Sequence, residues 1–335
     1  MTLLPYTLAA ALADGRFHTG DALGRQFGVT RAAIWKALRK CDELGLELHS
    51  VRGKGYRLDE PLFLLDATQI RAVLSPTNQE RLAGLELLPT VDSTNAHVLR
   101  QWQAGALTLA PGQSHVCLAE RQSAGRGRRG RDWVSPFGHN LYLSLLQRFD
   151  SGAASLDGLS LAVGVALVRA LREWRIPRLA LKWPNDLLCD EAKLAGILIE
   201  ISGDVTGQCQ LVIGIGLNVK QNTVKMRGVE QPWTTLVAQG FRSEQRNRLF
   251  GRILEHQLEA LATFQREGFA AFAADWNALD VSAGREVWLL SGTEAIAGVG
   301  RGVDDGGALL LDTIEGRRRV VGGELSLRLA AAPCF

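Results

Sequence analysis

The sequence predicts an α+β fold in three parts: a winged helix-turn-helix, a central domain built on a mixed sheet, and a small β-barrel. Short helical segments followed by a two-strand hairpin occupy residues 1–62. Apolar strand-like runs surround one apolar helix in residues 63–280, and closely spaced short strands with Gly and Asp turns fill residues 281–335. We therefore expect a domain over each of these three ranges.

The first part has the order of elements found in DNA-reading winged helices. Thr30 is a good N-cap for a helix expected to run to Leu44, in which Ile34, Leu38 and Cys41 share one face. From residue 16 to residue 57 there are nine Lys or Arg and four acids, a local charge of +5 that suits contact with phosphates. The candidate DNA contacts are Thr30, Arg31, Trp35, Lys36, Arg52 and Lys54. A protein-interaction or dimerisation module with solvated charges is the alternative.

Composition excludes several classes of protein. The net charge of the chain is only +3, so any contact with a polyanion must be local. No run reaches the roughly 18 apolar residues of a membrane span, and the apolar start lacks the basic segment of a secretion signal. The five cysteines are scattered without C-x-x-C spacing, which predicts a cytoplasmic protein without a metal site.

The central part combines strands with two long helices. Strand-like runs lie at 115–120, 140–149, 179–183, 194–201 and 210–219. Turns such as Pro184-Asn185-Asp186 join some of them too closely for a helical crossover, which favours an antiparallel or mixed sheet. Residues 157–174 predict a buried helix and residues 243–267 a long amphipathic one.

One loop, "GRGRRGRDWVSPFG" at 125–138, has no ordinary structural explanation. Its G-x-G-x-x-G spacing is that of a dinucleotide loop, but a strand follows it where that motif requires a helix. Its arginines suggest a nucleic-acid tail, but such tails usually sit at chain ends and this run lies between two strands. The remaining interpretation is a glycine-hinged lid that closes over a small anionic ligand.

The chain resembles the biotin–protein ligases. The motifs that carry the resemblance are, in order, "VDSTN" (91–95), the arginine loop within 120–144, "LKWPNDL" (181–187), "KLAGILIE" (193–200), "GIGLNV" (214–219) and "GGELSLR" (322–328). With a winged helix in front, the chain resembles the bifunctional bacterial form, which joins the ligase and a biotin-operon repressor. The resemblance implies a catalytic domain of the biotin/lipoate ligase type and an SH3-like barrel at the end.

The resemblance also implies a chemistry and a set of site residues. A biotin carboxylate attacks the α-phosphate of ATP, and a lysine of a carrier protein then takes the biotinyl group from the adenylate. It implies catalytic roles for Lys193, Asp186 and Arg128. Biotin contacts are expected at Ser93, Thr94, Asn95, Gln122, Arg126, Gly127, Arg128 and Lys193. Adenylate contacts are expected at Arg128, Arg129, Arg131, Trp133, Asn185, Asn218 and Trp233, and a further ATP or carrier contact at Glu324 and Arg328.

A purely structural role is the alternative for several of these residues. Lys193 could be a solvated edge residue, Asp186 a turn-forming residue, Ser93 or Thr94 a helix cap, and Trp233 a core residue.

The expected ligands and partners are ATP, biotin, Mg²⁺, the biotin carboxyl carrier protein of acetyl-CoA carboxylase, operator DNA and, with adenylate bound, a second copy of the chain. Two features depart from the family pattern: Trp35 in the recognition helix and the segment 221–233. They leave the operator and the strength of dimerisation open. A lipoate–protein ligase and a biotin-sensing repressor without catalysis are the alternative functions.

Overall fold

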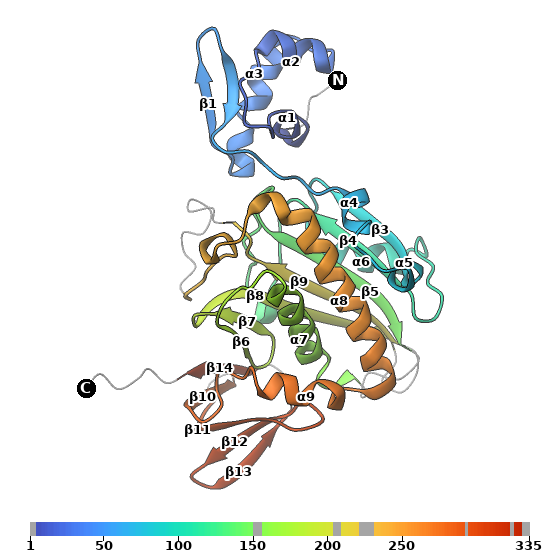
Figure 1. Ribbon diagram of the computed structural model, residues 1–335, viewed down its shortest axis with the longest axis vertical. Coiled ribbons are helices and arrows are strands. Elements are labelled where there is room, and N and C mark those ends of the chain that lie inside the picture. Colours follow the sequence, from blue (N-terminus) through green and yellow to red (C-terminus); the bar gives the residue numbers. More distant parts are fainter. Residues whose placement is uncertain are drawn as a thin grey trace, which may run out of the picture.

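The computed structural model describes residues 5–149, 156–203, 209–220, 231–291, 294–321 and 325–329. The three expected parts follow one another along the long axis of the molecule, with the winged helix-turn-helix at one end and the small β domain at the other (Figure 1). Among the described residues, none of the helices combines the length and the apolar character that crossing a bilayer requires.

The first part is a helix-turn-helix with a hairpin wing. Its elements are α1 (Pro5–Ala11), α2 (Gly20–Phe27), α3 (Arg31–Leu38), a 3-10 turn (Cys41–Leu44), β1 (Leu48–Val51) and β2 (Gly55–Leu58). The Thr30 hydroxyl accepts a hydrogen bond from the backbone of Ala33 and caps α3 as predicted. The predicted end of this helix at Leu44 is wrong. The helix ends at Leu38, and a separate turn buries Cys41 and Leu44 against α1 and the loop that contains Phe137.

The central sheet has seven strands in the order β3-β4-β5-β9-β8-β7-β6. The strands are β3 (Leu82–Leu88), β4 (Ser114–Ala119), β5 (Leu141–Phe149), β6 (Leu179–Lys182), β7 (Asp186–Cys189), β8 (Ala192–Gly203) and β9 (Cys209–Leu217). β3 and β4 are parallel, because α6 (Thr94–Gln103) connects them, and every other neighbouring pair is antiparallel. The prediction of a mixed sheet is confirmed.

Helices cover both faces of this sheet. One face packs against α7 (Leu159–Arg172) and α8 (Arg246–Glu267), the two helices predicted from their apolar patterns, with α4 (Ala67–Arg71), α5 (Pro76–Arg81) and α9 (Ala270–Asn277) around them (Figure 1). The other face is covered by α6. Alternate residues of β4 therefore enter different cores: Val116 and Leu118 belong to the α7–α8 side and Cys117 to the α6 side.

The last part is a five-stranded antiparallel sheet in the order β13-β12-β11-β10-β14. Its strands are β10 (Glu286–Ser291), β11 (Glu294–Val303), β12 (Leu309–Thr313), β13 (Gly316–Val320) and β14 (Leu325–Leu329). The indole N–H of Trp183 donates to the carbonyl of Gly307, and Leu181 pairs with the segment 279–281, so this sheet is docked beside β6.

A buried ion pair anchors the segment that leaves the winged helix. Arg246 on α8 and Glu120 are both almost fully buried and lie 2.7 Å apart. The same guanidinium donates to the carbonyl of Phe63, and the Glu120 carboxylate accepts from the backbone of Leu65. Phe137, which closes the arginine loop, is buried in the core of the winged helix. The loop and the first domain are therefore in direct contact.

Candidate active site

A cavity of about 770 Å³ opens above β5, β8 and β9. Its walls come from the first turn of α6, the arginine loop, the segment 231–233 and β14 of the last domain. The expected site residues that line it are Ser93, Thr94, Asn95, Gln122, Arg126, Gly127, Arg128, Arg131, Trp133, Asn185, Lys193, Asn218, Trp233 and Arg328. Residues scattered over more than two hundred positions are thus brought to one place.

The end of the cavity at α6 is a buried polar network. Ser93 caps the helix, so its predicted alternative role as a cap is real, and it also lines the cavity. The Thr94 hydroxyl donates to the amide oxygen of Gln122 at 3.1 Å and lies 2.7 Å from the Ser144 hydroxyl. Asn95 accepts from Ser144 and donates to Glu200. Ser93, Thr94, Asn95 and Gln122 all line the cavity, and polar side chains placed in this way fix the orientation of a polar ring.

The arginine loop forms a short hairpin over the cavity. Gly127 donates to the carbonyl of Arg131 at 2.7 Å and Trp133 donates to the carbonyl of Gly125 at 2.9 Å. Arg126 forms an ion pair with Glu200 on β8, and Arg128 donates to the side chain of Asn185.

Arg129 is the exception in this loop. It is exposed, has a left-handed backbone (φ 59°) and lines a neighbouring hollow instead of the main cavity.

Lys193 and Asp186 form a nearly buried ion pair. Nζ of Lys193 lies 2.8 Å from Oδ1 of Asp186, and the two side chains are only 16% and 13% exposed. Lys193 is within β8 rather than ahead of it, and Asp186 is the first residue of the neighbouring strand β7. This burial does not fit the alternatives of a solvated Lys193 and of an Asp186 that only forms a turn.

Trp133 rests on a floor without side chains. A Cβ atom on Gly216 would lie 2.4 Å from its indole Cε2, and one on Gly196 would lie 3.1 Å from Cζ3. Nζ of Lys193 lies 5.5 Å from the centre of the indole, close enough for a cation–π contact. The two glycines therefore let the aromatic ring come close to the backbone of β8 and β9.

The remaining expected contacts that the structure describes line the same cavity. Trp233 is half-buried and its backbone bridges to Lys193, while Asn218 donates to the carbonyl of Lys193 at 3.4 Å. Arg328 reaches the cavity from β14. Glu324 and residues 221–230 lie outside the described residues.

Sequence reasoning missed the supporting residues. Glu200, which holds both Asn95 and Arg126, and the glycines of the floor carry no motif of their own. Lys182, opposite Asp186 in the β6–β7 hairpin, is half-buried, and its burial lowers the pKa of its ammonium. Its place in "LKWPNDL" was the available signal.

This arrangement suits an anionic ligand with a polar ring. Lys193, Arg128, Arg131 and Arg328 bring positive charge to one part of the cavity, where phosphate or carboxylate oxygens would be stabilised. The α6 end offers uncharged donors and acceptors. The hairpin can exclude water from a reactive intermediate.

Five of the candidate DNA contacts are exposed on two elements of the first domain, α3 and the wing. Arg31, Trp35 and Lys36 are exposed on α3, and Arg52 and Lys54 are exposed at the tip of the wing. Trp35 is 52% exposed and lies 5.0 Å from the Arg39 guanidinium, in cation–π geometry. Thr30 is occupied as the helix cap.

Three families match this chain in succession. Residues 7–57 match a helix-turn-helix domain, residues 87–218 the biotin/lipoate A/B protein ligase family, and residues 283–328 the biotin protein ligase C-terminal domain.

Known proteins match this chain over most of its length. The bifunctional ligase/repressor BirA of Salmonella typhimurium is 41% identical over 98% of this chain and 99% of its own length. The biotin–[acetyl-CoA-carboxylase] ligase of Paracoccus denitrificans is 36% identical, covering 71% of this chain and 98% of its own. The solved structure of biotin protein ligase from Aquifex aeolicus in complex with biotin and ATP is 31% identical, with a TM-score of 0.59 over 75% of this chain and 100% of that one.

Proposed function

The chain belongs to the biotin–protein ligases, in the bifunctional ligase/repressor form, and we propose that its cavity makes biotinyl-5′-AMP and passes the biotinyl group to a lysine of a carrier protein. The observation that carries this proposal is the meeting of the arginine hairpin, Lys193 and the polar end of α6 in one cavity. One relative with this fold, the biotin protein ligase from Aquifex aeolicus, has a solved structure in complex with biotin and ATP.

The first step joins biotin to ATP. A carboxylate oxygen of biotin attacks the α-phosphorus, an acyl–phosphate bond forms, and the bond to the β-phosphate breaks to release pyrophosphate. Ser93, Thr94, Asn95 and Gln122 hold the ureido ring, and Arg126 and Gly127 close the hairpin over it. Arg128 and Lys193 stabilise the negative charge that grows on the transferring oxygens.

We assign the nucleotide half of the adenylate to Arg131, Trp133, Asn185, Asn218 and Trp233, which all line the cavity, with Trp233 on the adenine ring. Arg129, which faces the neighbouring hollow, and Arg328 are assigned to the outgoing phosphates.

The second step transfers the biotinyl group. The ε-amine of the carrier lysine attacks the acyl carbon, an amide forms, and AMP leaves with the electrons of the broken acyl–oxygen bond. Asp186 accepts the proton of the amine. Its contact with Lys193 keeps this carboxylate oriented until the carrier arrives. The proposed carrier is the biotin carboxyl carrier protein of acetyl-CoA carboxylase, and the proposed compartment is the cytoplasm.

Magnesium is expected to enter with the nucleotide. Among the described residues that line the cavity, Asp132 is the single carboxylate. A magnesium ion bound by protein alone needs more oxygen ligands than that, so these residues do not form a cage, and no step above depends on one.

A transfer assay tests the ligase. The full chain is incubated with ATP, Mg²⁺, a biotin carrier domain and either biotin or lipoate, and the carrier is probed with streptavidin or an anti-lipoyl antibody. We expect biotin transfer alone, lost in Lys193→Ala. Lipoate transfer would establish the alternative ligase, and no transfer at all would leave only the repressor.

We further propose that the adenylate-bound chain represses biotin genes as a DNA-binding dimer. Closure of the hairpin orders a surface for a second copy, and a two-fold dimer presents two winged helices to paired half-sites. Lys54→Ala should reduce the salt dependence of operator binding by about one phosphate contact. Arg128→Gly should weaken adenylate retention and dimerisation together. Unchanged dimerisation in that variant would disprove the coupling.

A further inference from the structure

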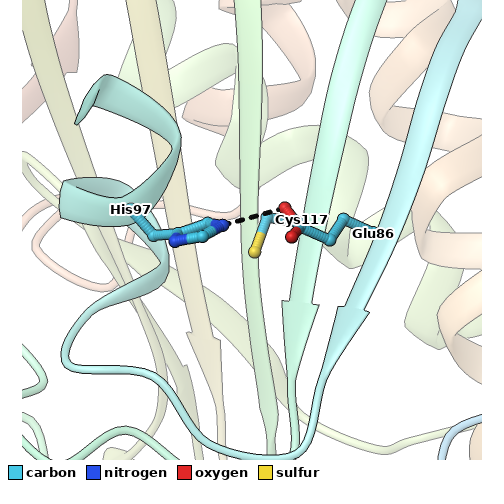
Figure 2. A group of neighbouring side chains, drawn as sticks. All are labelled: Glu86, His97 and Cys117. Carbon is cyan, nitrogen blue, oxygen red and sulfur yellow. Dashed lines mark hydrogen bonds and ion pairs between the residues drawn. The ribbon is translucent and has the colours of Figure 1, made fainter. Parts of the chain in front are cut away.

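A cluster of metal-binding side chains lies on the α6 side of the sheet, away from the cavity. Glu86 on β3, His97 on α6 and Cys117 on β4 place one possible ligand atom each within 4.8 Å of one another (Figure 2). Glu86 and Cys117 are directly opposite in the register of the two parallel strands, so their side chains share a face, and α6 lays His97 across it.

The side chains of the cluster are already close together and partly accessible. Nε2 of His97 lies 2.9 Å from a carboxylate oxygen of Glu86. The thiol of Cys117 is fully buried, and burial raises its pKa, so without a metal it keeps its proton. Both Glu86 and His97 are about a quarter exposed, which leaves an ion a path from solvent.

A second histidine faces the same cluster. His115 is two residues before Cys117 on β4, so it points to the same face, and its Nε2 lies 4.0 Å from the Glu86 carboxylate. That nitrogen is buried and has no hydrogen-bond partner among the described residues. The ring packs over Gly84, where a Cβ would lie 2.6 Å from Nδ1. The glycine thus makes room for the His115 imidazole, whose Nε2 has no hydrogen-bond partner among the described residues.

The donor types decide which ion fits. A thiolate, two imidazoles and a carboxylate are the ligands of zinc, whereas magnesium and calcium prefer oxygen alone. Ligand atoms around tetrahedral zinc are about 3.3–3.8 Å apart, given bonds of about 2.0–2.3 Å. The ligand atoms of Glu86, His97 and Cys117 already lie within 4.8 Å of one another, and Nε2 of His115 lies 4.0 Å from the Glu86 carboxylate. We propose that Glu86, His97, His115 and Cys117 bind one zinc-class divalent cation.

Such an ion would fix α6 to the edge of the sheet. His97 follows Ser93, Thr94 and Asn95 by two to four residues, and those three residues line the ligand cavity. Bound zinc therefore holds the helix whose first turn shapes that cavity. The ion itself is outside the cavity, so the metal site stands or falls independently of the ligase assignment.

Cobalt spectroscopy tests the site. The full chain is stripped with a chelator and given one equivalent of Co²⁺, which absorbs in the near ultraviolet through a thiolate–cobalt transition and in the visible through tetrahedral ligand-field bands. We expect both, and we expect one equivalent of Zn²⁺, but not excess Mg²⁺, to abolish them. Zinc should also raise the thermal midpoint of the stripped chain, since it binds the folded state.

The variants separate the cluster from other thiols. Cys117→Ser should lose the thiolate band, and His97→Ala should weaken cobalt binding at least about tenfold. Cys189→Ser is the matched control, because Cys189 is equally buried but donates to the carbonyl of Pro177 and lies on β7. Circular dichroism of the stripped variants checks folding, and the part-exposed His97 carries the test if Cys117→Ser does not fold.

Three results would overturn the proposal. The first is a stripped wild-type chain without a thiolate–cobalt band. The second is a band that persists in Cys117→Ser, and the third is a band that disappears in Cys189→Ser.

Discussion

The glycine floor under Trp133 offers a sharp test of how the arginine hairpin closes. In Gly216→Ala the new Cβ would lie 2.4 Å from the indole Cε2. An ordinary contact is at least 3.4 Å, so the ring must move by about 1 Å, a difference of 3.4 − 2.4. Gly216 is in the middle of the sheet, paired with Tyr142 on one side and Gly196 on the other, so the backbone cannot yield in its place.

The cost of this overpacking follows from measured core substitutions. Crowding a packed site costs about 1–3 kcal/mol. At about 1.4 kcal/mol per factor of ten, the closed hairpin becomes about 5- to 150-fold less favoured. Biotinyl-5′-AMP should then dissociate faster by the same factor, which a filter assay with radiolabelled adenylate measures.

A double-mutant cycle isolates the steric cause. Trp133→Ala removes the ring that Gly216→Ala pushes, so the second substitution should add little to the first. Adenylate dissociation at the wild-type rate in Gly216→Ala would refute this account of the floor, and so would fully additive effects of the two substitutions.

Three other predictions concern the scaffold. Arg246→Leu leaves the Glu120 carboxylate buried without its partner and should lower the free energy of unfolding by about 3–5 kcal/mol, measured by denaturant titration. Burial lowers the pKa of His139, so below about pH 6.5 the unfolded chain binds a proton that the folded chain does not bind. The free energy of unfolding should therefore fall as the pH drops below about 6.5, by at most about 1.4 kcal/mol per pH unit. His139→Gln should flatten this dependence when thermal midpoints are measured against pH. Phe137→Ala should leave biotin transfer near the wild-type rate while reducing the effect of adenylate on DNA binding, because its ring joins the hairpin to the winged-helix core; equal DNA responses in a gel shift would contradict this.

Local sequence patterns predict most of the helices and strands of the fold. The apolar run of α7, the amphipathic run of α8 and the alternating strands are decided by burial of their own side chains, so the sequence reveals them. The end of α3 is different. Its last expected turn is replaced by a 3-10 turn because Leu44 meets Phe137 and Cys41 meets Pro5, contacts from distant positions that no local pattern contains.

The candidate site shows the same division. The arginine loop, Lys193 and Asp186 were identified through motifs, but their support by Glu200 and by the glycine floor depends on the register of β8 against β9. The side-chain cluster of Glu86, His97 and Cys117 has no sequence signal for the same reason. Without C-x-x-C spacing, ligands on β3, α6 and β4 look unrelated in the sequence, and only the parallel pairing of β3 with β4 brings Glu86 beside Cys117.

A single-turnover transfer from a preloaded chain tests most directly whether the cavity makes biotinyl-5′-AMP and passes the biotinyl group on. The chain is incubated with biotin and ATP, freed of unbound ligands by gel filtration, and mixed with the carrier domain without further ATP. One biotinyl group should be transferred for each AMP released, and Asp186→Asn should load normally but transfer about 10²- to 10⁴-fold more slowly. A preloaded chain that transfers nothing until ATP is added again would show that the cavity holds no biotinyl-5′-AMP ready for transfer.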